Sequence, residues 1–220
     1  MSLPAGVQRV TIDGERTLAT RGDPISGEAT SDGWRRWDPH RSKLAAMLES
    51  GFDTRLEPDE RVLYLGAAAG TTVSHVADFA GPTYAVEFAP RPMRDLIDVA
   101  RSRSNLHPLL KDARRPETYG HVVESGLSTL IQDVATTDQA AVATRNARFL
   151  APEGTLLLAV KARSKDVTRE PAAVFEETVA ALEPTYEVLE TGELDPFHDA
   201  HLGVVATPAR STPEDGSGAP

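Results

Sequence analysis

The feature that most constrains the fold is a strand–turn–helix unit at residues 62–79, "VLYLGAAAGTTVSHVADF". Four apolar residues typical of a buried strand lead into a turn with Gly66 and Gly70, and a helical pattern follows. Glycines let the backbone turn tightly and approach a ligand closely. The G-x-x-x-G spacing is neither G-x-G-x-x-G nor a P-loop, and it lacks the lysine that binds phosphates. The unit therefore predicts a site for a nucleotide-like ligand without a triphosphate.

The rest of the chain alternates strand and helix patterns. Strands are expected at residues 62–65, 83–88, 106–110, 127–133 and 155–161. Helices are expected at residues 72–79, 90–103, 116–123, 139–149 and 170–182. Two further strands, at 186–194 and 202–207, are joined by a short loop and predict an antiparallel hairpin at one edge. This order predicts an α/β fold with a mostly parallel seven-stranded sheet and helices on both faces.

The two ends of the chain have different patterns. Residues 7–20 alternate apolar and polar around Asp13-Gly14, which predicts a hairpin. Residues 21–36 are expected to form a loop or edge strand, and a helix is expected from Ser42 to Gly51. The C-terminal residues 208–220 are rich in Pro, Ser and Gly, a composition that predicts disorder. We expect a small N-terminal β-hairpin subdomain at 1–36, a main domain at 37–207 and a disordered tail at 208–220.

Composition excludes some classes of protein and leaves others open. The 220 residues carry a net charge of −10, contain no cysteine and include no apolar run long enough to span a membrane. The N-terminus has no secretory pattern, so a cytoplasmic protein is expected. Only four of the 23 basic residues are lysines, a composition that resembles proteins of salt-accumulating microbes. Because charges are screened beyond about 3 Å in molar salt, the acidic balance does not exclude RNA as a partner.

In a parallel sheet the carboxyl ends of the strands meet at one edge, where ligands bind. Three acids are expected there: Glu87, Asp112 and Asp133 end the second, third and fourth strands. An acid about 20 residues after a glycine turn accepts hydrogen bonds from ribose hydroxyls, as expected of Glu87, and Asp112 could bind an adenine amino group. Without a phosphate-binding lysine, these acids favour an adenosine without phosphates, namely S-adenosylmethionine (SAM).

Thr71 and Thr72 begin the helix after the turn, where hydroxyl and free N–H groups meet a polar ligand. Structural interpretations remain open for each of these features. The glycines can form a generic Rossmann turn, the two threonines can cap the helix, and Asp112 can cap a turn.

Several longer motifs resemble the fibrillarin family, most closely its short archaeal form, over about residues 15–207. The motifs are "WDPHRSKLAA" (37–46), "YLGAAAGTTVSHVAD" (64–78), "YAVEF" (84–88), "RDLIDVA" (94–100), "KDARRPE" (111–117), "DVATTDQ" (133–139) and "VKAR" (160–163). The resemblance implies a Rossmann-like SAM-dependent methyltransferase fold and 2′-O-methylation of ribose in rRNA, with tRNA as a second candidate substrate. It also implies a box C/D particle in which a guide RNA selects the target, a Nop-domain scaffold protein docks the enzyme and a kink-turn-binding ribosomal protein organises the RNA.

Site residues follow from the same resemblance. The implied SAM contacts are Gly66, Thr71, Thr72, Glu87, Phe88, Asp112, Ala113, Asp133, Val134, Ala135, Thr136 and Gln139. The implied catalytic residues are Lys43, Asp133, Lys161 and His201. This sequence departs from the family at Ala69, where a serine is usual, and at Thr136-Thr137, where Gln-Pro is usual. His198 competes with His201 for the histidine position; His201 is favoured because it directly precedes a strand.

Methyl transfer to a ribose requires the 2′ oxygen to be aligned and its proton removed. A lysine can act as a base only where nearby positive charge and burial favour its neutral form. We therefore interpret Lys161 as the base or hydroxyl-orienting group, Asp133 as the acid that holds the lysine pair, and Lys43 as a group that orients the hydroxyl or a phosphate. His201 would be auxiliary. The histidines show no metal-ligand spacing, so no metal is expected.

Two basic clusters are candidates for contact with RNA or the scaffold. The first comprises Arg35, Arg36 and Arg41 around Lys43, interleaved with Trp34 and Trp37. The second comprises Arg91, Arg94, Arg101, Arg103, Lys111, Arg114 and Arg115. Solvated helix faces and packed tryptophans are the structural alternatives. Two other functions remain open: a stand-alone small-molecule methyltransferase and a mainly structural subunit of an RNA particle.

Overall fold

A seven-stranded sheet in the order β10-β11-β9-β8-β5-β6-β7 organises the computed structural model, which describes residues 3–25, 27–165 and 169–210. The strands of this sheet are β5 Val62–Leu65, β6 Thr83–Glu87, β7 Leu106–Leu110, β8 Leu127–Gln132, β9 Leu150–Lys161, β10 Tyr186–Glu193 and β11 His201–Pro208. The helices are α1 Lys43–Glu49, α2 Thr71–Ala77, α3 Pro90–Ala100, α4 Gln139–Asn146, α5 Ala162–Lys165 and α6 Pro171–Leu182, with 3₁₀ turns η1 Pro116–Thr118 and η2 Ala147–Phe149.

Strands β5 to β9 are parallel, whereas β11 runs antiparallel to both β9 and β10. The predicted fold class and its edge hairpin are confirmed. The strand order reverses at β5, which pairs with β6 on one side and with β8 on the other. In open α/β sheets such a switch point opens a crevice at the carboxyl ends of the strands. The loops that follow β5 and β8 meet there.

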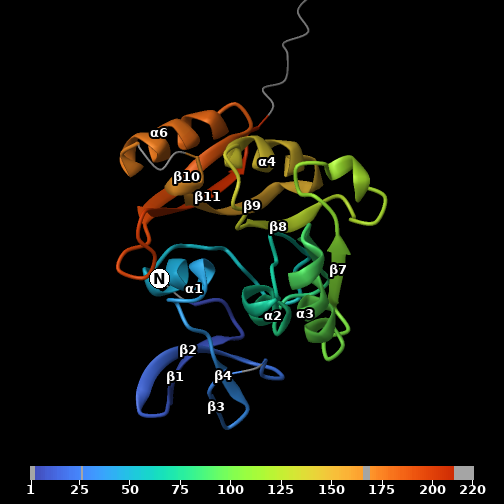
Figure 1. The fold of residues 1–220 in the computed structure, drawn as a ribbon, viewed down its shortest axis with the longest axis vertical. Helices are drawn as coiled ribbons and strands as arrows, with labels where there is room; N and C mark the ends of the chain where they lie inside the picture. Colours follow the sequence, from blue (N-terminus) through green and yellow to red (C-terminus); the bar gives the residue numbers. More distant parts are fainter. Residues whose placement is uncertain (1–2, 26, 166–168, 211–220) are drawn as a thin grey trace, which may run out of the picture.

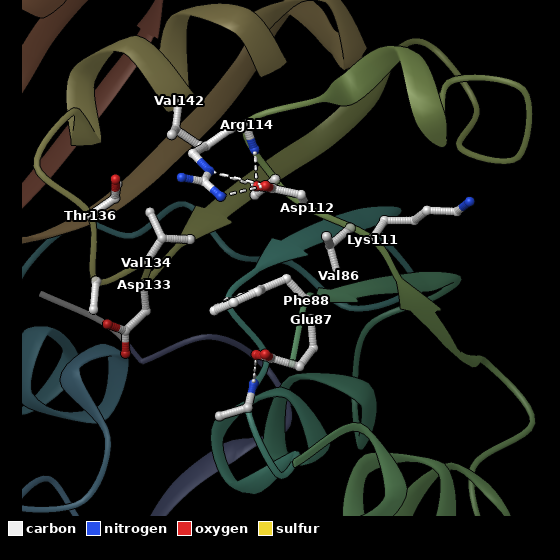
Figure 2. Close-up of a pocket in the computed structure, with 14 residues that line it drawn as sticks. Val86, Glu87, Phe88, Lys111, Asp112, Arg114, Asp133, Val134, Thr136 and Val142 are labelled. Atoms are coloured by element: carbon white, nitrogen blue, oxygen red, sulfur yellow. Dashed lines mark hydrogen bonds and ion pairs between the residues drawn. The ribbon is translucent and has the colours of Figure 1, made fainter. Parts of the chain in front are cut away.

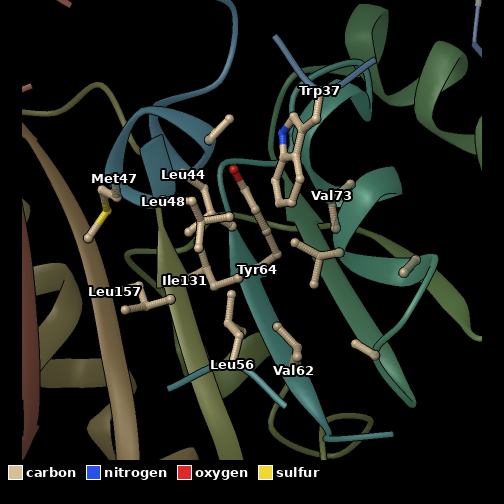
Figure 3. Close-up of a cluster of buried hydrophobic side chains, with 14 of the residues drawn as sticks. Trp37, Leu44, Met47, Leu48, Leu56, Val62, Tyr64, Val73, Ile131 and Leu157 are labelled. Carbon is tan, nitrogen blue, oxygen red and sulfur yellow. The ribbon is translucent and has the colours of Figure 1, made fainter. Parts of the chain in front are cut away.

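The central strands are buried on both faces of the sheet: every residue of β5 and β6 is buried, and so are five of the six residues of β8. Figure 1 shows α1, α2 and α3 on one side of the sheet and α4 and α6 on the other. The side chains of β5 alternate accordingly: Val62 and Tyr64 belong to one buried cluster, and Leu63 and Leu65 belong to the other. In Figure 3, the Tyr64 side chain lies beside Leu44 and Leu48 of α1. This packing fixes α1 over the carboxyl ends of the strands.

The N-terminal segment forms a separate four-stranded sheet in the order β1-β2-β4-β3. Its strands are β1 Val7–Ile12, β2 Glu15–Arg21, β3 Thr30–Ser31 and β4 Trp34–Arg36. The predicted hairpin is confirmed, and its turn places Asp13 and Gly14 at φ values of 53° and 81°. Two consecutive positive φ angles match the twist of a tight hairpin, and Asp-Gly tolerates them.

A buried charge network joins this small sheet to the main sheet's helices. Arg35 of β4 is fully buried and donates to Asp78 (2.7 Å), Glu28 (2.8 Å) and Ser74 (3.0 Å). Arg103 also pairs with Asp78. His75 of α2 stacks on Trp37 with ring centroids 4.8 Å apart. Because each buried charge has a partner, the network holds the two sheets in one relative position.

Some element predictions were wrong. The helix expected at 116–123 is limited to η1, because the buried Tyr119 hydroxyl bonds Asn146 at 2.5 Å and the chain turns back at Gly120. Strand β9 begins at Leu150, five residues early, because Leu150 pairs with Leu127 before a register shift. The short helix α5 was not anticipated. Most of the predicted tail, residues 211–220, lies outside the described residues. None of the described helices is long and apolar enough to cross a membrane.

Candidate active site

A cavity of about 300 Å³ opens at the carboxyl ends of β5, β6, β7 and β8 (Figure 2). Its walls combine apolar side chains with three carboxylates, and Figure 2 shows Phe88, Val134, Glu87, Asp112 and Asp133 around the same space. The lining residues are Gly66, Ala68, Val86, Glu87, Phe88, Lys111, Asp112, Ala113, Arg114, Asp133, Val134, Ala135, Thr136 and Val142. Nine of the twelve predicted cofactor contacts are in this set. The structure therefore brings most of the predicted site together.

The glycine loop forms the floor of the crevice. Gly66 has φ 85° and Gly70 has φ 94°, values that favour glycine. A Cβ at Gly66 would overlap the backbone carbonyl of Asp133. The missing side chain therefore lets the β5 and β8 loops close together, and it brings Asp133 to the cavity wall.

Glu87 at the end of β6 holds the loop in shape. Its side chain is almost fully buried, and its two carboxylate oxygens accept from the backbone N–H groups of Ala68 (2.9 Å) and Ala89 (2.7 Å). A carboxylate oxygen has a second lone pair, so each can also accept from a ligand hydroxyl. Glu87 thus combines a structural role with the capacity to bind a diol.

Asp112 is paired with Arg114, a residue that the sequence reasoning did not connect with the site. Arg114 donates to both Asp112 oxygens at 2.6–3.0 Å. The Arg114 hydrogen bonds lower the pKa of Asp112 and keep the carboxylate charged. The motif "KDARR" contained the signal, since an arginine two residues after an aspartate can fold back onto it. Phe88 beside them is 69% exposed and offers a free ring face at the cavity mouth.

The cavity fits an adenosine that carries no phosphates. Valine, alanine and phenylalanine side chains provide apolar walls for a base, and two carboxylates can accept from hydroxyl and amino groups. Of the two basic side chains, Arg114 is neutralised by Asp112, and Lys111 is exposed and points away from the centre in Figure 2. Chemistry and shape therefore suit SAM better than a nucleotide triphosphate.

Lys43 lies beside this cavity because α1 begins there. Its Nζ donates to Asp133 Oδ2 at 2.8 Å, and the two side chains are about a quarter exposed. Ser42 caps α1 by accepting from the Ala45 N–H at 3.2 Å and from Trp37 Nε1 at 3.0 Å. The buried Ser42 hydroxyl thus fixes the first turn of the helix that carries Lys43.

Lys161, the last residue of β9, is the register partner of His201, the first residue of the antiparallel strand β11. Burial, followed by the charge of Lys43, lowers the pKa of His198. Burial also lowers the pKa of His201. The two histidine rings lie 5.6 Å apart, and both Nε2 atoms are buried without a hydrogen-bond partner among the described residues. The charges of Lys43 and Asp133 act on both imidazoles, so the histidine role is open to either.

Three predicted cofactor contacts lie outside the cavity wall. Thr71 borders a separate cavity of about 430 Å³ on the other side of the glycine loop. The Thr72 hydroxyl is 3.1 Å from Ser42 Oγ. Gln139 is buried, with its amide bonded to the backbone of Lys161. The sequence patterns could not separate ligand contacts from these internal bonds.

The predicted basic surface beside Lys43 was partly wrong. Arg35 and Trp37 are fully buried, so neither can contact RNA. Arg36 pairs with Glu15, whereas Arg41 is exposed. In the second cluster Arg103 is buried, and three other arginines pair with nearby acids: Arg101, Arg114 and Arg115. Among the described residues, no three His, Asp or Glu side chains are grouped to hold a metal ion.

Fold and cavity together define a Rossmann-like methyltransferase. Residues 6–210 match the fibrillarin family model. A fibrillarin-like rRNA/tRNA 2′-O-methyltransferase of Halorubrum lacusprofundi is 67% identical over 207 residues, which covers 94% of this chain and 98% of that protein. The Haloarcula marismortui protein of the same description is 63% identical, with 96% and 100% covered. The chain therefore belongs to the fibrillarin family, as its motifs predicted.

Solved structures agree with this assignment. Fibrillarin from a fibrillarin/Nop5p complex superposes with a TM-score of 0.86 and 39% identity, covering 95% of this chain and 100% of that one. Fibrillarin of Aeropyrum pernix, described with natively bound S-adenosyl-L-methionine, superposes with a TM-score of 0.80 and 40% identity, covering 91% and 100%.

Proposed function

We propose that this protein methylates the 2′ oxygen of ribose in rRNA and tRNA, with SAM as the methyl donor, as the catalytic subunit of a guide-RNA-directed box C/D particle. One observation carries the proposal. Lys43 forms an ion pair with Asp133 at the wall of a cavity suited to adenosine, and the strand register pairs Lys161 with His201, in a chain of the fibrillarin family. The names of close relatives and the SAM-bound Aeropyrum pernix fibrillarin support it.

The cofactor would lie against the glycine loop. Glu87 would accept from the ribose hydroxyls, Asp112 from the adenine amino group, and Phe88 would cover one face of the base. The amino-acid part would reach the loop that begins with Asp133, Val134, Ala135 and Thr136. When bound, SAM supplies an electrophilic methyl group on a sulfonium. Thr71, Thr72 and Gln139 would support the site from behind its wall.

The chain's own groups would align and deprotonate the target hydroxyl. Lys43 and Lys161 would flank the 2′ oxygen, with Asp133 holding the lysines. Bound SAM would supply the methyl group, and the 2′-OH proton would pass to a lysine amine or to a histidine. Alignment would supply the larger share of acceleration, and proton removal about 10²–10⁴-fold.

Recruitment of RNA would depend on partners. The chain carries a net charge of −10, and several of its arginines are neutralised by acids. Such a surface gives little unassisted affinity for a polyanion. A Nop-domain scaffold would dock the enzyme, as the solved fibrillarin/Nop5p complex suggests by analogy. A kink-turn-binding ribosomal protein would organise the guide RNA, and the particle would act in the cytoplasm.

Methyl incorporation from labelled SAM tests this proposal. The protein would be assembled in molar salt with scaffold protein, kink-turn-binding protein, guide RNA and a matching target RNA. Label in 2′-O-methylribose at the guided nucleotide, lost when guide or scaffold is omitted, is the expected result. No 2′-O-methylribose in the complete particle would overturn the proposal, and label transferred to a free small molecule would favour a stand-alone methyltransferase instead.

A further inference from the structure

The side-chain amide of Gln139 makes two hydrogen bonds to the backbone of one residue, Lys161. Lys161 N–H donates to Gln139 Oε1 at 2.8 Å, and Gln139 Nε2 donates to the Lys161 carbonyl at 3.1 Å. Gln139 is 2% exposed, and its side chain is absent from the cavity wall. The amide therefore bonds the main chain of the candidate catalytic lysine instead of facing the ligand.

The position of Lys161 at the end of its strand explains why it needs this partner. The parallel pairing of β8 with β9 ends where Gln132 lies opposite Leu158, three residues before Lys161. The next residue, Ala162, donates to Ala200 on the β11 side. Because backbone groups alternate sides along a strand, those of Lys161 point toward the missing end of β8. An unpartnered N–H and C=O there would each cost free energy.

Gln139 is in turn hydrogen-bonded to the last residue of β8. It is the first residue of α4, and its backbone carbonyl accepts from the side chain of Gln132 at 2.7 Å. Gln132 is the last residue of β8 and is fully buried. A chain of hydrogen bonds thus runs from β8 through Gln139 to Lys161. The Gln139 side chain takes the place of a further β8 residue as the hydrogen-bond partner of β9.

We propose that Gln139 is a positioning residue that sets the location of Lys161 relative to Asp133, and that it is not a contact for the cofactor. The proposal rests on the proposed role of Lys161 in methyl transfer. An amide meets the requirement because it offers one acceptor and one donor on the same planar group. A carboxylate can only accept, and a thioether supplies neither bond of useful strength.

Gln139→Met tests the positioning role, since methionine is similar in length and apolar. The readouts are kcat in the complete guide-RNA particle and the Kd of SAM for the isolated protein. Loss of positioning lowers kcat by at least about tenfold and leaves the Kd within about twofold. A raised Kd with unchanged kcat at saturating SAM would instead identify a cofactor contact and overturn the proposal, as would no change in either quantity.

Asn105→Leu is the matched control, because the Asn105 amide also bonds the backbone, donating to the carbonyls of Ala77, Ala80 and Gly81, which are outside the cavity wall. SAM-binding stoichiometry gives the folded fraction of every variant. If Gln139→Met binds no SAM, Gln139→Glu is assayed in its place. Equal loss of kcat per folded molecule in the Asn105 control would assign the effect to general destabilisation and overturn the proposal.

Gln139→Glu adds a pH signature. A neutral carboxyl group can accept from the Lys161 N–H and donate to its carbonyl, whereas the ionised form cannot donate. The ratio of variant to wild-type kcat should therefore fall as pH rises. A ratio independent of pH would count against the donor role of Gln139.

Lysine resonances test the same idea without catalysis, and so separate its failure from failure of the proposed function. The chain has only four lysines, so selectively labelled lysine signals can be assigned, with Lys161→Arg identifying the relevant one. Gln139→Met should shift the Lys161 signal and leave that of exposed Lys111 in place. An unmoved Lys161 signal would overturn the inference even if the particle is active.

Discussion

Lys43 Nζ and Asp133 Oδ2 lie 2.8 Å apart although 90 residues separate them in the chain. Lys43 begins a helix packed over β5, and Asp133 follows β8 at the switch point of the sheet. The ion pair is therefore a product of the sheet topology, and it places a cation and an anion beside the cofactor cavity. Partly exposed pairs of this kind contribute less than about 1 kcal/mol to stability, so its value lies in the site.

Replacing Lys43 should separate activity from stability. Lys43→Met is expected to lower kcat by at least about 100-fold, because the target ribose loses an orienting cation. The free energy of unfolding should change by less than about 1 kcal/mol. Methylation assays in the complete particle and urea titrations check the two quantities. Full activity of the variant would contradict the role given to the ion pair.

Lys161→Ala should abolish methyl transfer while SAM still binds, because Lys161 is outside the cavity wall. The loss in kcat should be at least about 100-fold. Arg16→Ala, on an exposed position of β2, is the control and should retain wild-type activity. Turnover at the wild-type rate would refute the base or orienting role of Lys161.

Gly66→Ala should weaken SAM binding. Both Gly66 and Gly14 have positive φ angles, so an alanine at either position carries a similar backbone strain of about 1 kcal/mol. Only at Gly66 would the new Cβ overlap a backbone atom, the carbonyl of Asp133; at Gly14 nothing lies within 4 Å. Calorimetric titration should show a Kd raised by about tenfold or more for Gly66→Ala and unchanged for Gly14→Ala. Equal SAM affinities of the Gly66→Ala and Gly14→Ala variants would show that the loop after β5 shifts to accommodate the new Cβ.

Arg35 and Arg36 are neighbours whose replacement is expected to destabilise the protein by very different amounts. Arg35→Met leaves the buried Asp78 and Glu28 without their shared cation and should cost about 3–5 kcal/mol. Arg36→Met removes a partly exposed pair with Glu15 and should cost less than about 1 kcal/mol. Denaturant unfolding in molar salt compares the two variants. A cost for Arg35→Met no larger than that for Arg36→Met would count against the network as the joint between the sheets.

Acid should destabilise the fold through His75. Burial lowers the pKa of His75 from 6.5 to about 4, and the Arg35 charge adds to the decrease. The nearby Glu28 and Asp78 carboxylates oppose this decrease but do not cancel it. Between these values the unfolded chain binds more protons than the folded one, so the free energy of unfolding falls by about 3 kcal/mol as pH falls from about 6.5 to 4.

Glu28 adds a second acid-sensitive group. Burial raises the pKa of Glu28, but hydrogen bonding from His75 and the Arg35 charge outweigh burial and lower this pKa to about 2. A further loss is therefore expected between about pH 4.5 and 2.

Urea titrations from pH 7.5 down to the acid range measure this slope. His75→Phe keeps a ring against Trp37 but cannot titrate, so its stability should depend less on pH above 4.5. His121→Phe, at an exposed position, should keep the wild-type slope. An unchanged slope in His75→Phe would assign the acid sensitivity to other groups.

Much of the site followed from residue order alone. Glu87, Asp112 and Asp133 were placed at one edge because parallel strands align their carboxyl ends, and all three line the cavity. Arg114 was missed because its role depends on a local ion pair rather than on a strand end. Gln139 was grouped with the cofactor contacts because it closes the "DVATTDQ" motif. Its actual partner, Lys161, is 22 residues away on another strand.

The sequence by itself determined the features that depend on near neighbours. These are the alternating strands and helices, the Asp13-Gly14 hairpin and the glycine turn after β5, where periodicity and backbone preferences suffice. The tertiary structure decided which polar side chains are internal. Arg35 resembles a surface arginine until Asp78, 43 residues later, is folded against it. Burial and pairing arise from packing of distant segments, so the same residue types that predict a ligand or RNA contact can instead form internal bonds that hold the fold together.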